Sequence, residues 1–123
     1  MKLSSFFHSF LSVLSFLPTL WEVIMTKNQR RNAMRANKWD LVGKIKLSRG
    51  CENENCPLPP DFIFESVDLD FDHLRDKKAA VSNLIRSDYA LHIILAEIDK
   101  CRVLCKFCHA RHSRDMRAAA KTA

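Results

Sequence analysis

Four cysteines in two close pairs limit the folding of this chain more than any other feature of its sequence. Cys51 and Cys56 are separated by four residues, and Cys105 and Cys108 form a CxxC motif. Two close pairs roughly fifty residues apart are typical of a tetrahedral Cys₄ zinc site, in which each pair closes a tight turn and the ion joins the turns. We therefore predict a structural zinc ion bound by these four thiolates.

The alternative is a set of buried, reduced cysteines in the core, because cysteine is among the most buried residue types. The total of 5 cysteines is odd, which argues against a secreted disulfide framework. Cys101 is expected to pack as a small apolar side chain, with an exchange of ligand roles between Cys101 and Cys56 as a secondary alternative. Thiolate ligands belong in a reducing compartment, so we expect a cytoplasmic protein.

The charge of the chain is unevenly distributed along its 123 residues, a length that suits one compact domain. Residues 26–50 carry eight cations and one acid, residues 51–72 carry seven acids and neither Lys nor Arg, and residues 73–123 carry eleven cations and five acids. The basic flanks predict a polyanionic partner, either nucleic acid or a membrane surface. The acidic segment between them suits a cation site inside a basic binding face. With only 2 glycines, the chain has no glycine-rich phosphate loop.

Four helices are predicted from the spacing of apolar residues. A basic helix covers 26–48, two shorter ones cover 80–86 and 88–99, and another basic helix runs from 106 to about 116. Residues 118–123 are expected to form a frayed tail. The residues expected on the apolar sides of the first and third helices are Met34, Trp39, Leu41, Val42, Ile45, Leu91, Ile94, Leu95 and Ile98.

Two short strands complete an α+β fold. In the first, Val67, Leu69 and Phe71 alternate with three aspartates, and the strand ends at Asp72-His73. Such alternation predicts an apolar face that packs inward and a row of carboxylates on the opposite face. The second strand covers 102–104 and leads into the CxxC motif.

Residues 3–21 contain no Lys, Arg, Asp or Glu. This segment has three interpretations: a signal peptide or membrane anchor, an amphipathic helix that docks on the domain, or an extension upstream of a start at Met25. Several hydroxyl residues, together with Pro18, argue against a membrane span. We therefore treat 1–25 as an apolar extension of one of the last two kinds and assign the functional domain to 26–117.

The motifs follow one another in an informative order: a cysteine pair, a strand ending in Asp72-His73, connecting helices, a short strand, and a CxxC motif followed by His109. In this order the chain resembles the HNH family of His-Me finger (ββα-metal) nucleases, and most closely a phage and bacterial subgroup with two cysteine pairs. The resemblance covers roughly residues 29–115. It is carried by Gly50-Cys51, Cys56, 69–73, Lys77-Lys78, 81–85 and 97–109.

This resemblance implies a small zinc-stapled ββα-metal domain that cleaves DNA, with His73 as general base. It assigns Asp72 and His109 to a catalytic divalent ion, Mg²⁺ or a similar cation. The chemistry agrees, because histidine ionises near neutral pH and Mg²⁺ takes few ligands from proteins. Taken singly, Asp72 could be an ordinary solvent-facing acid and His73 a cap. The asparagine usual in the family is absent, since Lys100-Cys101 stand where it normally falls.

The expected partner is double-stranded DNA, and several cations are candidates for contacts to its phosphates. These are Arg30, Arg31, Arg35, Lys38, Lys77, Lys78, Arg111 and Arg114. A solvated helix face is the simpler explanation of the same charges. His112 either assists the metal, contacts phosphate or is merely exposed, and Asp70 either joins the cation site or tunes its field. The main rival function is a non-catalytic, zinc-stabilised nucleic-acid-binding module.

Overall fold

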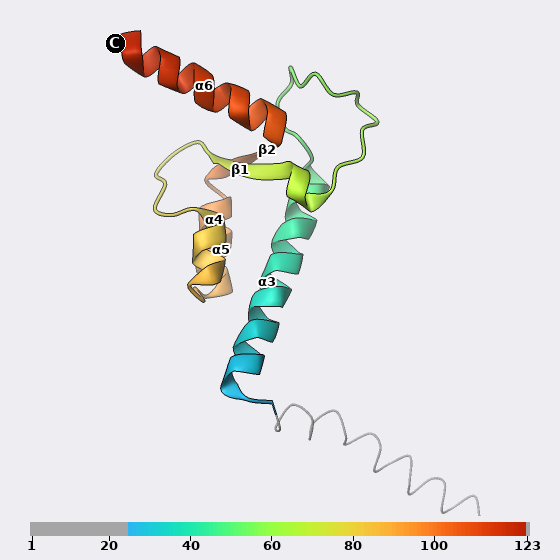
Figure 1. Cartoon of the computed structure of the whole chain (residues 1–123), viewed down its shortest axis with the longest axis vertical. Coiled ribbons are helices and arrows are strands. Elements are labelled where there is room, and N and C mark those ends of the chain that lie inside the picture. The colour runs from blue at the N-terminus through green and yellow to red at the C-terminus, as the bar shows by residue number, and fades with distance from the viewer. Residues whose placement is uncertain (1–24, 123) are drawn as a thin grey trace, which may run out of the picture. The chain divides into compact units, whose positions relative to one another are not determined.

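The computed structural model describes residues 25–122, which form four α-helices, a short 3₁₀ helix and a two-stranded antiparallel sheet (Figure 1). The mixed helix-and-strand class predicted from the sequence is therefore confirmed. None of the helices in this range is both long and apolar enough to cross a membrane. Residues 1–24 of the expected apolar extension lie outside the described residues. The elements are α3 (Lys27–Arg49), η1 (Ser66–Asp68), β1 (Leu69–His73), α4 (Val81–Arg86), α5 (Leu91–Ile98), β2 (Cys101–Cys105) and α6 (Lys106–Thr122).

Local sequence chemistry accounts for both ends of α3. At the start, the Thr26 amide donates to Oε1 of Gln29 at 2.8 Å, and the Gln29 amide donates back to the Thr26 hydroxyl at 3.2 Å, which is a capping box. At the end, Gly50 adopts a left-handed conformation with φ of 63°. Because glycine has no Cβ, it stops the helix there and redirects the chain into Cys51.

The two strands are far apart in the sequence but pair residue for residue. Leu69 lies opposite Cys105, and at the other end of the sheet His73 lies opposite Cys101. β2 runs directly into α6, which packs against both strands. The order of the packed elements is thus strand, strand, helix, with α4 and α5 inserted between the strands.

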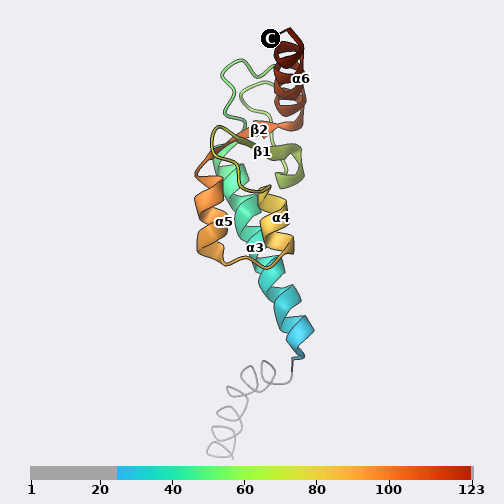
Figure 2. The same cartoon turned by 90° about the vertical axis from the view of Figure 1, so that its left-hand side faces the viewer.

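Two hydrophobic clusters meet at Phe71. In the first, Val42 of α3 packs with apolar residues of α4 and α5, and Figure 2 shows these two helices beside α3. The second joins Leu69 to Val103 and Leu104 of β2 and to the cysteines. Because Phe71 packs against both clusters, it ties the strand pair to the helices.

Several predicted element boundaries and core positions are wrong. Val67 is 65% exposed, because Glu65 and Asp68 form a capping box that closes a 3₁₀ turn before the strand can begin. α6 continues to Thr122, beyond the predicted end near residue 116. On α3 and α5 only a narrow stripe contacts the core. The expected core residues that prove exposed are Met34, Trp39, Leu41, Leu91 and Leu95.

Candidate metal centre and catalytic groove

The predicted cysteine cluster forms. The sulfur atoms of Cys51, Cys56, Cys105 and Cys108 all lie within 4.8 Å of one another, and none is in a disulfide. The sulfurs of Cys56 and Cys105 are 3.9 Å apart. Two sulfurs on a tetrahedral zinc ion, with bonds of about 2.3 Å, lie about 3.8 Å apart. The four thiols therefore fit a metal ion such as zinc.

The first cysteine pair reaches the second because its loop is tied to the edge of β2. The Glu52 amide donates to the Val103 carbonyl, and the Val103 amide donates to Oε1 of Glu52, both at 2.8 Å. Arg49 then pairs with the Glu52 carboxylate at 2.7 Å and donates to the Cys101 carbonyl at 2.8 Å. These contacts position the loop from residue 51 to 56 beside the CxxC turn.

Burial affects the ionisation of the cysteine thiols in the cluster. Burial raises the pKa of the Cys108 thiol to about 12, an effect that Asn53 partly offsets and the neighbouring thiols reinforce. A bound cation would stabilise the thiolate and reverse this effect. In addition, the Cys108 amide donates to the Cys105 sulfur at 3.4 Å, which stabilises negative charge on that sulfur.

Cys101 is not a member of the cluster. It is buried, and its thiol donates to the Glu97 carbonyl at 3.3 Å. The expectation that it packs as a small side chain is confirmed. The alternative in which it exchanges roles with Cys56 is wrong, because Cys56 is the residue whose sulfur lies with the other three.

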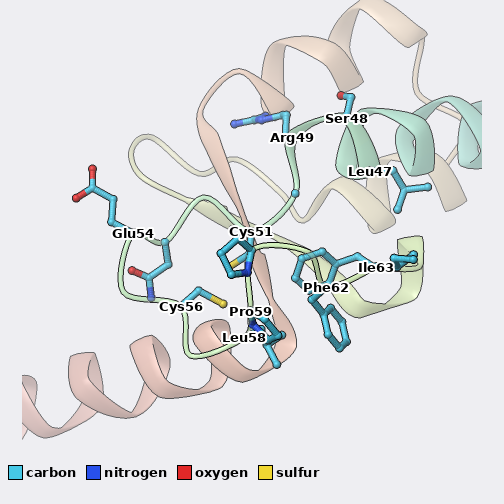
Figure 3. Close-up of a pocket in the computed structure, with 14 residues that line it drawn as sticks. Leu47, Ser48, Arg49, Cys51, Glu54, Cys56, Leu58, Pro59, Phe62 and Ile63 are labelled. Atoms are coloured by element: carbon cyan, nitrogen blue, oxygen red, sulfur yellow. The ribbon is translucent and has the colours of Figure 1, made fainter.

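A cavity of about 730 Å³ opens beside the cluster (Figure 3). It lies between the end of α3 and the loop that follows, with Leu47, Leu58, Phe62 and Ile63 among its apolar residues. Its lining includes neither histidine nor aspartate, so it does not overlap the residues expected to carry out catalysis.

A separate groove of about 560 Å³ contains Asp72, His73 and His109. Its walls come from α3, from β1, from the segment leading into α4 and from α6. Asp70 also lines it, since Asp70 and Asp72 are two residues apart on one strand face. The fold thus brings together the three residues to which the family resemblance assigns catalysis.

Asp72 is not the solvent-facing acid that simple strand alternation suggests. It is only 9% exposed, and Nε of Arg102, its cross-strand neighbour, donates to its Oδ2 at 2.9 Å. Two histidines of α6 flank the carboxylate. Nε2 of His109 lies 3.9 Å from Oδ1, and Nε2 of His112 lies 3.8 Å from Oδ2.

Asp70 orients His109. Its Oδ2 lies 3.1 Å from Nδ1 of His109, and its Oδ1 accepts from Lys106 at 3.1 Å. Although burial acts in the opposite direction, these two hydrogen bonds hold the pKa of Asp70 below its ordinary value. Because an ionised carboxylate only accepts, Nδ1 carries the hydrogen and Nε2 is left as the acceptor facing Asp72.

Glu97 is a site residue that the sequence analysis missed. Its Oε1 accepts from Nε2 of His73 at 2.9 Å, and both side chains are nearly buried. The same carboxylate accepts from the Lys78 amide and the Lys100 ammonium, each at 2.9 Å. The Lys100 and Lys78 contacts dominate and, despite burial, lower the pKa of Glu97 to about 2. The clue in the sequence was an acid inside the buried stripe of α5, next to Ile98.

The Glu97→Gln variant is expected to be less stable by about 2 kcal/mol at neutral pH, because a buried charged acceptor is lost. Since the folded pKa of about 2 lies below the ordinary 4.5, the carboxylate contributes stability above pH 4.5 and loses it as the pH falls toward 2. The stability gap between wild type and variant should therefore close over that range. Urea unfolding at stepped pH measures it, with exposed Glu54→Gln as control. A gap independent of pH would contradict the assignment.

Two of the cations expected to contact DNA make contacts between α3 and the segment after α4. Arg35 pairs with Asp88 at 3.2 Å, and Lys38 donates to the Tyr89 carbonyl at 2.8 Å. These contacts hold α3 against the segment between α4 and α5. The others have exposed side chains: Arg30, Arg31, Lys77, Lys78, Arg111 and Arg114.

Residues 25–122 therefore contain a four-cysteine cluster that can hold a metal and, separately, a groove with paired aspartates and histidines. A function has to be argued from these sites, because a fold alone does not determine one. Comparisons of the chain with protein-family models, with curated proteins and with solved structures each find no match.

Proposed function

We propose that the chain is a metal-dependent DNA endonuclease of HNH type. The observation that carries this proposal is the meeting of Asp72, His73 and His109 in one groove, on a strand–strand–helix unit. This arrangement agrees with the family that the sequence resembles. Phosphodiester hydrolysis needs a base for water and positive charge near the phosphate, and the residues of this groove can provide the base and hold a cation.

The four cysteines would bind zinc in a purely structural role. Four thiolates fill a tetrahedral shell, which leaves no position open for substrate. The ion would join the loop after α3 to the end of β2 and the first turn of α6, and so keep His109 beside β1.

Asp72 and His109 fit a second, divalent ion. The 3.9 Å between Oδ1 and Nε2 is too long for a hydrogen bond. A divalent ion with bonds of about 2.1 Å could be held by both atoms. When bound, such an ion supplies positive charge that offsets the charge developing on the phosphate and on the departing 3′ oxygen.

His73 is the proposed general base. Because Nε2 donates to Glu97, Nδ1 is the ring nitrogen left to accept a proton. It takes this proton from the water that attacks phosphorus, and the Glu97 carboxylate stabilises the imidazolium that results. The bond from phosphorus to the 3′ oxygen breaks, the 3′ oxygen is protonated by solvent, and the products carry 5′-phosphate and 3′-hydroxyl ends.

One contact favours the second candidate, a zinc-stabilised nucleic-acid-binding module without cleavage. Arg102 already neutralises Asp72 through a 2.9 Å hydrogen bond, so the buried carboxylate has a partner without a metal. In this function the groove would bind the DNA backbone and no water would be activated.

Nicking of supercoiled plasmid DNA separates the two functions. The wild-type protein is expected to nick the plasmid with Mg²⁺ or Mn²⁺, and not in EDTA, and to leave ends that a ligase can reseal. The resealing follows from the 5′-phosphate and 3′-hydroxyl termini. DNA binding without nicking under any divalent cation would reject the nuclease and support the binding module.

A further inference from the structure

Lys46 brings a cation without an ionic partner into the groove of Asp72, His73 and His109. Within residues 25–122 its ammonium makes no hydrogen bond or ion pair, and its nitrogen lies 5.3 Å from the centre of the Phe71 ring. The neighbouring cations differ in this respect. Lys106 is paired with Asp70, and Arg102 is paired with Asp72.

The position of Lys46 is costly for an isolated charge. The side chain is half-buried, and burial lowers the pKa of Lys46, while Asp70 raises it and Lys106 lowers it further. A cation that has lost water without gaining a hydrogen-bonded anion is destabilised relative to one in solvent. An anionic ligand in the groove would supply the missing partner.

The surrounding charges leave room for such an anion. Asp70 is hydrogen-bonded to both Lys106 and His109, and Asp72 to Arg102. The two carboxylates are thus offset by their own cations. The charge of Lys46 is left for a ligand, and an ammonium with three donors suits the non-bridging oxygens of a phosphate.

We propose that Lys46 forms a phosphate-binding subsite that holds the DNA backbone beside Asp72, His73 and His109. This inference rests on the proposed function, which makes DNA the ligand. It also makes α3 one wall of the substrate groove. Through Lys46, α3 supplies a contact to phosphate that the strand–strand–helix unit does not supply. Lys46 is a positioning residue here, because it holds the phosphate rather than moving a proton.

The chain offers a matched control on the same helix. Lys44 is two residues away, which on an α-helix places it on nearly the opposite face. Its ammonium is exposed and paired with Asp40 at 3.0 Å. Lys46→Met and Lys44→Met remove the same net charge, and methionine keeps an unbranched stem that can pack on Phe71.

The experiment is binding of a short fluorescein-labelled DNA duplex in buffer without Mg²⁺ or Mn²⁺, followed by anisotropy at several salt concentrations. Lys46→Met is expected to weaken binding about three- to tenfold and to reduce the slope of log K against log salt by about one. Lys44→Met should stay close to wild type in both quantities, and Lys46→Arg should restore both. Circular dichroism and metal content verify that each variant is folded.

Equal affinities and equal salt slopes for Lys46→Met and Lys44→Met would overturn the subsite. The subsite would also be overturned if Lys46→Met regained wild-type affinity under conditions in which it is fully folded. The loss of binding would then reflect lower stability alone. If Lys46→Met fails to fold, the same comparison is made with Lys46→Gln and Lys44→Gln, and equal salt slopes of these two variants overturn the subsite. Because this binding assay needs no cleavage, wild type that binds DNA but does not nick it with any divalent cation rejects the nuclease alone. Wild type that does not bind rejects both proposals.

Discussion

Cys108→Ser is expected to lose its bound metal and its cooperative unfolding transition. The variant should hold close to no zinc, whereas we expect about one ion per chain in the wild type, because zinc affinity and folding are coupled in small zinc domains. Metal content by mass spectrometry and thermal unfolding by circular dichroism measure the two effects.

The size of the effect follows from the position of the cluster in the core. Cys105 and Cys108 are buried with Leu69 and Leu104, so the sulfurs form part of one of the two hydrophobic clusters. Without an ion, the loop that begins at Cys51 is held to β2 mainly by hydrogen bonds at its partly exposed edge. Such contacts are worth about 1 kcal/mol each and do not replace a metal site.

Cys101→Ser is the matched control. This cysteine is also buried, but the only hydrogen bond of its thiol among the described residues is to the Glu97 carbonyl, and a serine hydroxyl can donate there equally well. The variant should keep its metal and its unfolding transition. A Cys108→Ser protein with wild-type zinc content would show that the four-cysteine assignment is wrong.

His73→Ala is expected to reduce plasmid nicking by about 10²- to 10⁴-fold, the range for loss of a general base. Glu97 still accepts from the Lys78 amide and the Lys100 ammonium, so its carboxylate keeps other partners in the variant. The fold and the zinc content should therefore be retained. Initial rates of supercoiled-to-nicked conversion, measured with saturating Mg²⁺, give the effect.

His92→Ala provides the comparison for this second prediction. His92 is an exposed histidine on α5 and does not line the groove, so its removal should leave the nicking rate unchanged. If His73→Ala, with zinc retained, nicked at the wild-type rate, His73 would not be the base. If both variants lost activity alike, the defect would lie in folding rather than in catalysis.

The groove that contains Asp72, His73 and His109 was only partly predictable from the sequence. That His73 ends a strand follows from the alternation of Leu69 and Phe71 with acids, and the structure bears this out. The pairing of Asp72 with Arg102 and of His73 with Glu97 was not predicted. Both pairs join residues more than twenty positions apart, and their contact depends on strand register and on how α5 packs.

Spacing along the chain was enough to identify the helices, both strands and the two close cysteine pairs, because each of these depends on residues close in sequence. It did not show that α6 covers Asp72, that Asp70 orients His109, or that Lys46 faces the same groove. These relations arise when separate segments pack against one another and exclude water. Hydrogen bonds and charges that are weak in solvent become decisive only in such packed positions.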